Sequence, residues 1–216
     1  MKRFVKILFA LLCSVCLLAS CANNKKTGFM GYEWQMDGDE VRAVAESNGG
    51  RVIDADDPEL GQLDPSHPII VVYDHPKDFP AEKLILFMPL FEGELRYFTG
   101  HTLIVGGGSG DAEQEINKMK EYFNGLYGKE PERHDTDTNK PEYDASWPDY
   151  SYHWNEYGST TELFVKTVSA KELAAQDTEL VFNDFGMQTL ARVSDVDIND
   201  LPPDTMLTAV TFFKVL

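Results

Sequence analysis

Aromatic side chains gather in one polar stretch of the sequence that also contains prolines. Residues 143–157 hold six aromatic rings, and two of the three tryptophans of the chain are among them. Aromatic rings beside polar groups stack on sugar faces or anchor a protein partner, because they bury a large area at low entropic cost. The ligand-binding residues predicted from this stretch are Tyr143, Trp147, Tyr150, Tyr152 and Trp154. The alternative is that these rings fix the stretch to the hydrophobic core.

Two acidic segments have part of the spacing of a calcium-binding loop. The first, third and fifth positions of such a loop are filled by Asp135, Asp137 and Asn139, and again by Asp195, Asp197 and Asn199. Both segments lack the glycine of the sixth position and the glutamate of the twelfth. We therefore expect solvated acidic turns, with an irregular calcium site as the alternative.

Other signatures of catalysis or cofactor binding are missing from the sequence. The five histidines include no pair four residues apart, so no zinc ligand set is predicted and scattered surface histidines are expected. Glycines at 106–108 and 110 precede a helical pattern, but no Lys-Ser or Lys-Thr follows as in a phosphate-binding loop, which favours a flexible turn. The GxSxG and SxxK motifs of serine acyl transfer do not occur. The sequence therefore predicts no metal and no cofactor.

Hydrophobic spacing and capping residues predict two or three helices that position these residues. The first covers residues 37–50 with an aspartate as its N-cap, and the second covers residues 111–128 with Asp111 as its N-cap. A short third helix opens at Ser169, which has a glutamate three residues later as in a capping box.

Apolar runs between these helices predict the strands. A buried strand is expected at 68–74, followed by three strands in series over 83–105. Pro89 favours an edge position for the first of the three, and tight connections are expected at Glu92-Gly93 and Gly100-His101. The C-terminal third adds strands at 161–168, 178–182, 187–194 and 205–215. The predicted fold class is α+β, with a mainly antiparallel sheet and two or three helices.

A single α+β domain is expected over residues 29–216. With 43% hydrophobic residues, the chain can bury one sizeable core. Residues 129–160 lack a hydrophobic period and contain Pro131, Pro141 and Pro148. A structureless connection of this length is uncommon in a compact domain, so we predict either a boundary between two lobes or a long surface loop there.

The start of the chain has the order of charge and hydrophobicity of a secretory signal. Lys2, Arg3 and Lys6 precede an uncharged run from Ile7 to Ala19. At 1.5 Å per residue this run covers about 20 Å, which is short of the roughly 30 Å hydrocarbon core of a membrane. A signal peptide over residues 1–20 is therefore predicted in preference to a membrane-spanning helix.

The sequence LASC at residues 18–21 resembles the lipobox of bacterial lipoproteins, in which an apolar residue and two small ones precede the lipidated cysteine. This resemblance implies cleavage before Cys21, a diacylglyceryl group on its thiol and a short polar tether over residues 21–28. Cys13 and Cys16 would leave with the signal peptide, so Cys21 would be the only cysteine of the mature chain. An ordinary secreted protein whose signal happens to end near a cysteine is the alternative.

The resemblance also implies a location in the bacterial cell envelope. Two or three acyl chains anchor a protein durably, because each buried CH₂ group contributes about 0.8 kcal/mol. The residue after the cysteine, Ala22, resembles that of lipoproteins sorted to the outer membrane of Gram-negative bacteria. A membrane-anchored lipoprotein, at the outer membrane in a Gram-negative host, is therefore expected.

The charge of the mature chain limits its partners. Removal of residues 1–20 leaves 16 basic against 36 acidic residues, a net charge of −20. Nucleic acid binding requires clustered Lys and Arg, so nucleic acid is excluded as a partner. The expected partners are the membrane, through the N-terminal lipid, and a protein or a glycan.

The function that best fits these features is non-covalent binding to an envelope component or to a protein partner. The alternative is a hydrolase that cleaves an envelope polymer through paired carboxylates, which need no local motif. Glu92 and Glu94 share a strand face and are one such pair, although carboxylates two residues apart on a strand generally face solvent.

We expect Cys21→Ala to release the protein from the membrane fraction, because no other mature cysteine is available for acylation. Fractionation of the variant and the wild type, with mass spectrometry of the N-terminal peptide, checks this. An unmodified thiol at the wild-type terminus, or a variant that stays in the membrane, would contradict it.

Overall fold

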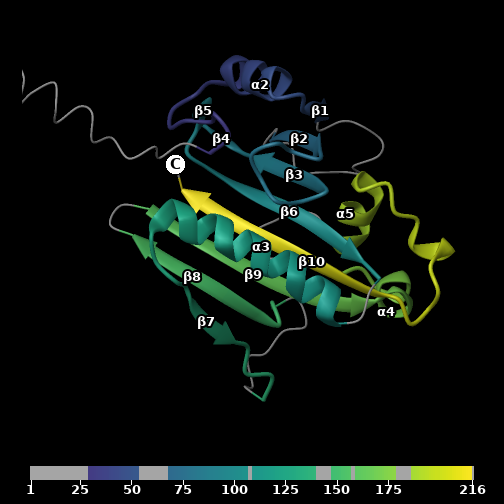
Figure 1. Ribbon diagram of the computed structural model, residues 1–216. Coiled ribbons are helices and arrows are strands. Elements are labelled where there is room, and N and C mark those ends of the chain that lie inside the picture. Colours follow the sequence, from purple (N-terminus) through teal and green to yellow (C-terminus); the bar gives the residue numbers. More distant parts are fainter. Residues whose placement is uncertain are drawn as a thin grey trace, which may run out of the picture.

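An antiparallel sheet of eight strands forms the centre of the protein, with helices on both faces (Figure 1). This computed structural model describes residues 29–53, 68–106, 109–139, 147–156, 159–178 and 186–215. The strand order is β1-β2-β3-β6-β10-β9-β8-β7, and a separate pair, β4 and β5, lies beside the sheet. The predicted α+β class with a mainly antiparallel sheet is confirmed. The predicted signal peptide and tether, residues 1–28, lie outside the described residues.

The elements follow one another along the chain as strands and helices of very different length. The strands are β1 (Arg51–Ile53), β2 (Ile69–Asp74), β3 (Lys83–Met88), β4 (Leu90–Phe91), β5 (Glu94–Leu95), β6 (Tyr97–Val105), β7 (Glu132–Asp135), β8 (Tyr150–Glu156), β9 (Ser159–Ser169) and β10 (Met206–Val215). The helices are α2 (Gly38–Ser47), α3 (Ser109–Tyr127), α4 (Ala170–Ala175), α5 (Met187–Val193) and the 3₁₀ helix η1 (Ile198–Asp200).

The last strand lies in the middle of the sheet. β10 pairs with β6 along Leu207–Val215 and with β9 along Met206–Lys214, antiparallel on both sides. Helix α3 leaves the end of β6 and crosses the sheet toward its far edge, from which β7, β8 and β9 return side by side to β10 (Figure 1). The C-terminal strand therefore joins two halves of the sheet that are formed earlier in the chain.

Alternating side chains of the strands supply two separate cores. In β2, Ile69, Val71 and Tyr73 contribute to the core under α2 and α3, while Ile70 and Val72 contribute to the core under α4 and α5. This alternation follows from the two-residue period of a strand. Because both faces are covered, β2 and β3 are almost entirely apolar.

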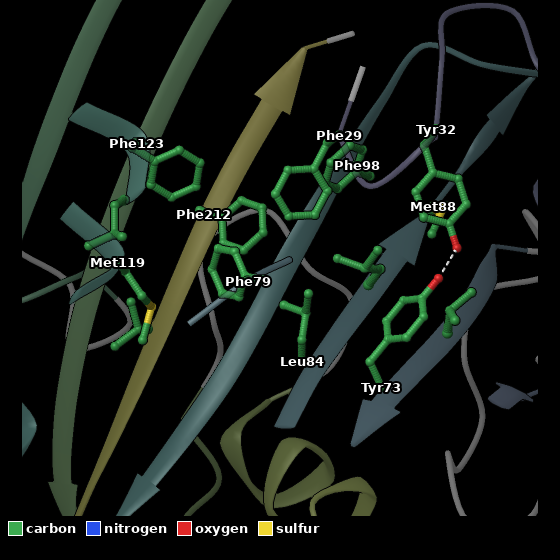
Figure 2. Close-up of a cluster of buried hydrophobic side chains, with 14 of the residues drawn as sticks. Phe29, Tyr32, Tyr73, Phe79, Leu84, Met88, Phe98, Met119, Phe123 and Phe212 are labelled. Atoms are coloured by element: carbon green, nitrogen blue, oxygen red, sulfur yellow. Dashed lines mark hydrogen bonds between the residues drawn. The ribbon is translucent and has the colours of Figure 1, made fainter. Parts of the chain in front are cut away.

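Aromatic rings dominate the larger core (Figure 2). Phe29, Phe79 and Phe212 pack with ring centroids 5.2 to 5.7 Å apart. At the β2 side of this core, the hydroxyl oxygens of Tyr32 and Tyr73 lie 2.6 Å apart and form a buried hydrogen bond. Burial raises the pKa of both tyrosines, so the two hydroxyls stay protonated.

The predicted helices are confirmed, with one change in their capping. Asp37 and Glu40 form a capping box at the start of α2, and Ser169 and Glu172 form another at the start of α4. Helix α3 begins at Ser109, two residues before the predicted N-cap, so Asp111 lies inside the helix. Local sequence is enough to place a helix where the cap and the hydrophobic spacing agree.

Two details predicted for residues 83–105 are wrong. Gly100-His101 is not a turn but the middle of β6, where His101 is fully buried between the hydroxyls of Thr99 and Thr211. Pro89 follows the end of β3, and β3 is an interior strand between β2 and β6. The turn at Glu92-Gly93 is confirmed: it joins β4 to β5, and both residues have positive φ.

A glycine is needed at position 100 because of the residue opposite it on the next strand, and not because of a turn. It pairs directly with Phe212 of β10, whose ring covers it. A Cβ atom at position 100 would lie 2.1 Å from the ring carbon Cζ of Phe212. The glycine therefore makes room for a core ring, a long-range reason that the local sequence does not reveal.

Two longer segments also differ from the prediction. Residues 187–194 were predicted as a strand but form α5, in which Met187, Leu190 and Ala191 are buried on one face at helical spacing. Residues 129–160, predicted as a lobe boundary or a long loop, contain β7 and β8, the last two strands of the same sheet. The predicted strand over residues 178–182 lies almost wholly outside the described residues.

We expect Gly100→Ala to lower the free energy of unfolding by about 1–3 kcal/mol, because the new methyl group overlaps the Phe212 ring. Thermal or denaturant unfolding measures the change, and Phe212→Leu should relieve part of it in the double variant. Gly125→Ala is the control, since that helical position has open space and alanine gains about 0.5–1 kcal/mol there. An equally stabilising Gly100→Ala would contradict the close approach.

Candidate functional site

A groove between α3 and the β7–β8–β9 side of the sheet brings together two of the predicted ligand-binding residues. It has a volume of about 380 Å³, within the roughly 300–1,000 Å³ range of small-molecule sites. We call it the tyrosine groove. The lining side chains that carry polar groups are Glu113, Asn117, Arg133, Tyr150, Tyr152, Thr167 and Thr208.

Strand β8 positions the tyrosines through its two-residue alternation. Tyr150, Tyr152 and Trp154 belong to or pack against the core under α3, whereas Ser151 and His153 lie on the other face of the sheet. The residues farther along α3 close the core, and its first turns, with Glu113, form the opposite wall of the groove. Alternation along one strand thus supplies adjacent rings on a single wall.

Arg133 holds the two tyrosine rings in place. Its guanidinium carbon lies 4.0 Å from the ring centroid of Tyr150 and 5.9 Å from that of Tyr152, which is cation–π geometry. Asp135 fixes the guanidinium by accepting hydrogen bonds from Nε at 2.9 Å and from Nη2 at 2.7 Å. Two bonds to one carboxylate oxygen orient the guanidinium, and this hydrogen bonding raises the pKa of Arg133.

The tyrosines form an angled wall rather than a flat platform. The rings of Tyr150 and Tyr152 are 5.8 Å apart and nearly perpendicular, at 84°. Arg133 Nη1 also donates a hydrogen bond of 3.4 Å to the Tyr152 hydroxyl, and the Lys120 ammonium lies 4.6 Å from the Tyr152 ring centroid. Burial raises the pKa of Tyr150, so its hydroxyl is a neutral donor and acceptor at neutral pH.

The floor of the groove adds hydroxyl and amide groups. Thr167 of β9 and Thr208 of β10 hydrogen-bond to each other through their hydroxyl oxygens at 3.1 Å. Asn117 and Glu113 face them from α3. Hydroxyl, amide, carboxylate and guanidinium groups around aromatic rings suit a ligand that carries many hydroxyl groups, because each ligand hydroxyl both donates and accepts.

The structure separates the five predicted ligand-binding residues. Tyr150 and Tyr152 line the tyrosine groove. Trp154 is fully buried, with 0% exposure: its Nε1 donates to Asn124 Oδ1 at 2.9 Å, and its ring packs on Phe123. Trp154 therefore belongs to the core, as the alternative interpretation held. Trp147 is 38% exposed and is not among the groove residues. Tyr143 lies outside the described residues.

Sequence reasoning missed the polar residues of the groove. Arg133 was not singled out, although its spacing two residues before Asp135 on a short strand places both side chains on one face. Glu113 and Asn117 are four residues apart and so lie on one face of α3. Neither spacing is specific, and Thr167 and Thr208 come together only through the pairing of β9 with β10.

The acidic segments use their carboxylates within the protein. Asp137 and Asp197 each accept a hydrogen bond from the backbone N–H two residues later, and Asp197 thereby caps η1. Asp135 and Asp195 form ion pairs with Arg133 and Lys83. Within the described residues, no group of three or more His, Cys, Asp or Glu side chains has the geometry of a metal site.

A serine, a histidine and a glutamate lie in a row on the opposite sheet face. Ser151 Oγ lies 2.7 Å from His153 Nε2, and His153 Nδ1 lies 3.3 Å from Glu162 Oε1. These groups are cross-strand or alternate neighbours on β8 and β9, a spacing that any antiparallel pair provides. Acyl transfer also needs a cleft and oxyanion donors beside the serine, and the tyrosine groove lies on the other face.

Comparison of the chain with protein-family models, with curated proteins and with solved structures found no match. Among the described residues, no helix is both long and apolar enough to cross a lipid bilayer.

We expect Trp154→Ala to lower the free energy of unfolding by about 3–5 kcal/mol, because it removes a fully buried ring and leaves Asn124 without its donor. Trp147→Ala, at the partly exposed ring, should cost about 1 kcal/mol or less. Unfolding curves of both variants measure the difference. Equal losses would show that the two tryptophans share one environment.

Proposed function

We propose that this protein is a lipid-anchored protein of the bacterial envelope that binds a hydroxyl-rich envelope component, such as a glycan, without covalent chemistry. The observation that carries the proposal is the convergence of Tyr150, Tyr152 and Arg133 with polar side chains of α3 in one groove. A glycan is favoured over a large protein surface because the groove is concave and small, about 380 Å³.

Pre-organisation of the groove supports a binding role. Tyr150 and Tyr152 are held by Arg133, which Asp135 holds in turn, so little side-chain entropy remains to be lost when a ligand binds. The positive charge of Arg133 is matched by Asp135 and by Glu113 across the groove. Recognition would therefore depend on hydrogen bonds and ring contacts rather than on net ligand charge.

The predicted anchor would keep the groove near the membrane. The eight residues from Cys21 to Gly28 of the expected tether span at most about 29 Å when extended. Phe29, where the described chain begins, is buried against Phe98 and Phe212. Because the domain starts at a core residue, the tether alone would set its distance from the bilayer, which suits a ligand of the envelope.

The composition of the groove favours binding over hydrolysis. Glycosidases of the common mechanisms place two carboxyl groups about 5 to 10 Å apart across the scissile bond. Glu113 is the single carboxylate among the lining residues of the tyrosine groove. Glu92, one of the predicted carboxylate pair, instead lies at the exposed β4–β5 turn, where it forms an ion pair with Arg96.

We expect the full chain, purified in detergent, to bind soluble cell-wall glycan fragments or lipopolysaccharide-derived oligosaccharides in calorimetric titration. Tyr150→Ala should weaken this binding by about thirtyfold or more, since truncation of an aromatic anchor costs about 2 kcal/mol. Arg133→Gln should weaken it as well, because the tyrosine rings lose their clamp. Trp34→Ala, at an exposed ring outside the groove, is the matched control and should bind normally.

Two results would overturn this proposal. One is binding that Tyr150→Ala and Arg133→Gln leave unchanged while both variants melt like the wild type. The other is release of shortened glycan products during the titration, which would favour the hydrolase alternative.

A further inference from the structure

The interior of the sheet contains a fork between β3 and β6. The two strands pair only at Ile85–Phe87 and Thr99–His101, yet β6 runs on to Val105. From Thr102 to Val105, β6 is paired with β10 alone, and no other strand of the described chain lies on its second side. An interior strand thus has a free edge over four residues.

A pocket of about 470 Å³ occupies this fork. Its lining comes from both sheet faces: Glu115 and Met119 belong to α3 on one side, and Ser194 and Val196 follow α5 on the other. The residues from Thr102 to Val105 form its inner wall. The pocket therefore follows the free edge of β6 through the plane of the sheet.

The free edge leaves backbone hydrogen-bonding groups facing the pocket. In an antiparallel strand, successive residues direct their N–H and C=O groups to opposite neighbours. Every second residue between Thr102 and Val105 therefore points both groups away from β10, toward the fork. Backbone groups of this kind are the template on which an additional strand forms.

One buried polar side chain and several partly exposed apolar ones border the fork. The Ser194 hydroxyl oxygen is buried and has no hydrogen-bond partner within the described structure. Leu103 and Ile104 are half-buried, and Val105 is 37% exposed, although β6 lies in the interior of the sheet. An apolar wall with one orphaned hydroxyl matches a ligand that alternates apolar and polar groups.

An ion-pair network ties the start of β3 to β2 and to the segment after α5. Lys83, the first residue of β3, places its Nζ 3.2 Å from Asp74 Oδ1 and 2.5 Å from Asp195 Oδ2, just after α5. The hydrogen bond from Lys83 lowers the pKa of Asp195, whose backbone has a positive φ of 61°. These bonds direct the start of β3 toward the α5 side and away from β6.

We propose that the fork binds an extended peptide segment, which pairs as an added strand with the free edge of β6 between Thr102 and Val105. Apolar side chains of the peptide contact Leu103 and Ile104, and a polar group of the peptide bonds with Ser194. The exposed carboxylate of Glu82 at the rim selects a peptide with basic residues beside this apolar core, whereas Glu115 is already paired with Lys118. The inference concerns a second site and does not rest on the tyrosine groove.

Hydrogen exchange of the full chain in detergent tests the proposal with a defined probe. The probe is a fluorescein-labelled hexapeptide of alternating valine and threonine with lysine at both ends. Its matched control has the same sequence with N-methylated backbone amides, which cannot donate to a strand. We expect the peptide to slow exchange of the Leu103 and Val105 amides, which face the fork, and to bind saturably in fluorescence polarisation. The methylated control should bind about tenfold more weakly or worse.

Two variants sharpen the test. Ser194→Ala should weaken peptide binding by about threefold to tenfold without lowering the melting temperature, because the hydroxyl makes no bond in the free protein. Tyr150→Ala should leave peptide binding unchanged, which separates this site from the tyrosine groove. The amides of Thr102 and Ile104 face β10 and are protected in either state. The proposal is overturned if the amides of Leu103 and Val105, which face the fork, are already protected without peptide. It is also overturned if no exchange slows there, or if Ser194→Ala or N-methylation has no effect.

Discussion

The position of β10 between β6 and β9 is the constraint on which both sites depend. Neither half of the sheet contacts the other through a different strand pair of the described chain. Along this seam, Phe212 fills the space above Gly100, and its ring joins Phe29 and Phe123 in the larger core. A strand late in the sequence therefore joins the two halves, and the long sequence separation between β10 and β6 predicts slow folding.

Both sites lie next to this seam, one on each side. β10 supplies Thr208 to the floor of the tyrosine groove, where it meets Thr167 of β9. β6, the other partner of β10, supplies the free edge of the fork from Thr102 to Val105. A slip of the β6–β10 register by one residue would move every side chain of the strand to the other face, so it would alter both sites together.

Local signals in the sequence were sufficient to predict some helices and strands but gave no indication of others. Asp37 and Ser169 identify their helices because a cap acts on the backbone next to it. Gly100 was interpreted as a turn because glycine serves turns and close contacts equally well, and only the distant Phe212 decides between them. Strand β8 was not predicted, because its aromatic residues were interpreted as a ligand-binding run. Its inward residues, Tyr150, Tyr152 and Trp154, nevertheless alternate with polar residues at the period of a strand.

The prediction of a strand over residues 187–194 was wrong for a related reason. Residues 187–193 contain threonine and valine, which favour strands, yet their buried positions fall on one helical face. Asp177 Oδ1 accepts a hydrogen bond from the N–H of Gln188 and so satisfies a backbone group of the first helical turn. This cap comes from a residue outside the run, and a seven-residue window is too short for the hydrophobic period to overrule propensity.

Neither of the two sites is distinguished by the sign of its net charge. The chain has a net charge of −20 after the predicted cleavage. In the tyrosine groove, Arg133 is paired with Asp135. At the fork, Lys83 is paired with Asp74 and Asp195. Paired cations act mainly as structural clamps: Arg133 orients rings, and Lys83 holds a strand end. The ligand-facing groups that remain are hydroxyls, ring faces and free backbone amides, which recognise shape and hydrogen-bond pattern. For that reason the acidic surface is compatible with a neutral glycan in the groove, while the exposed carboxylate of Glu82 at the rim favours basic residues at the fork.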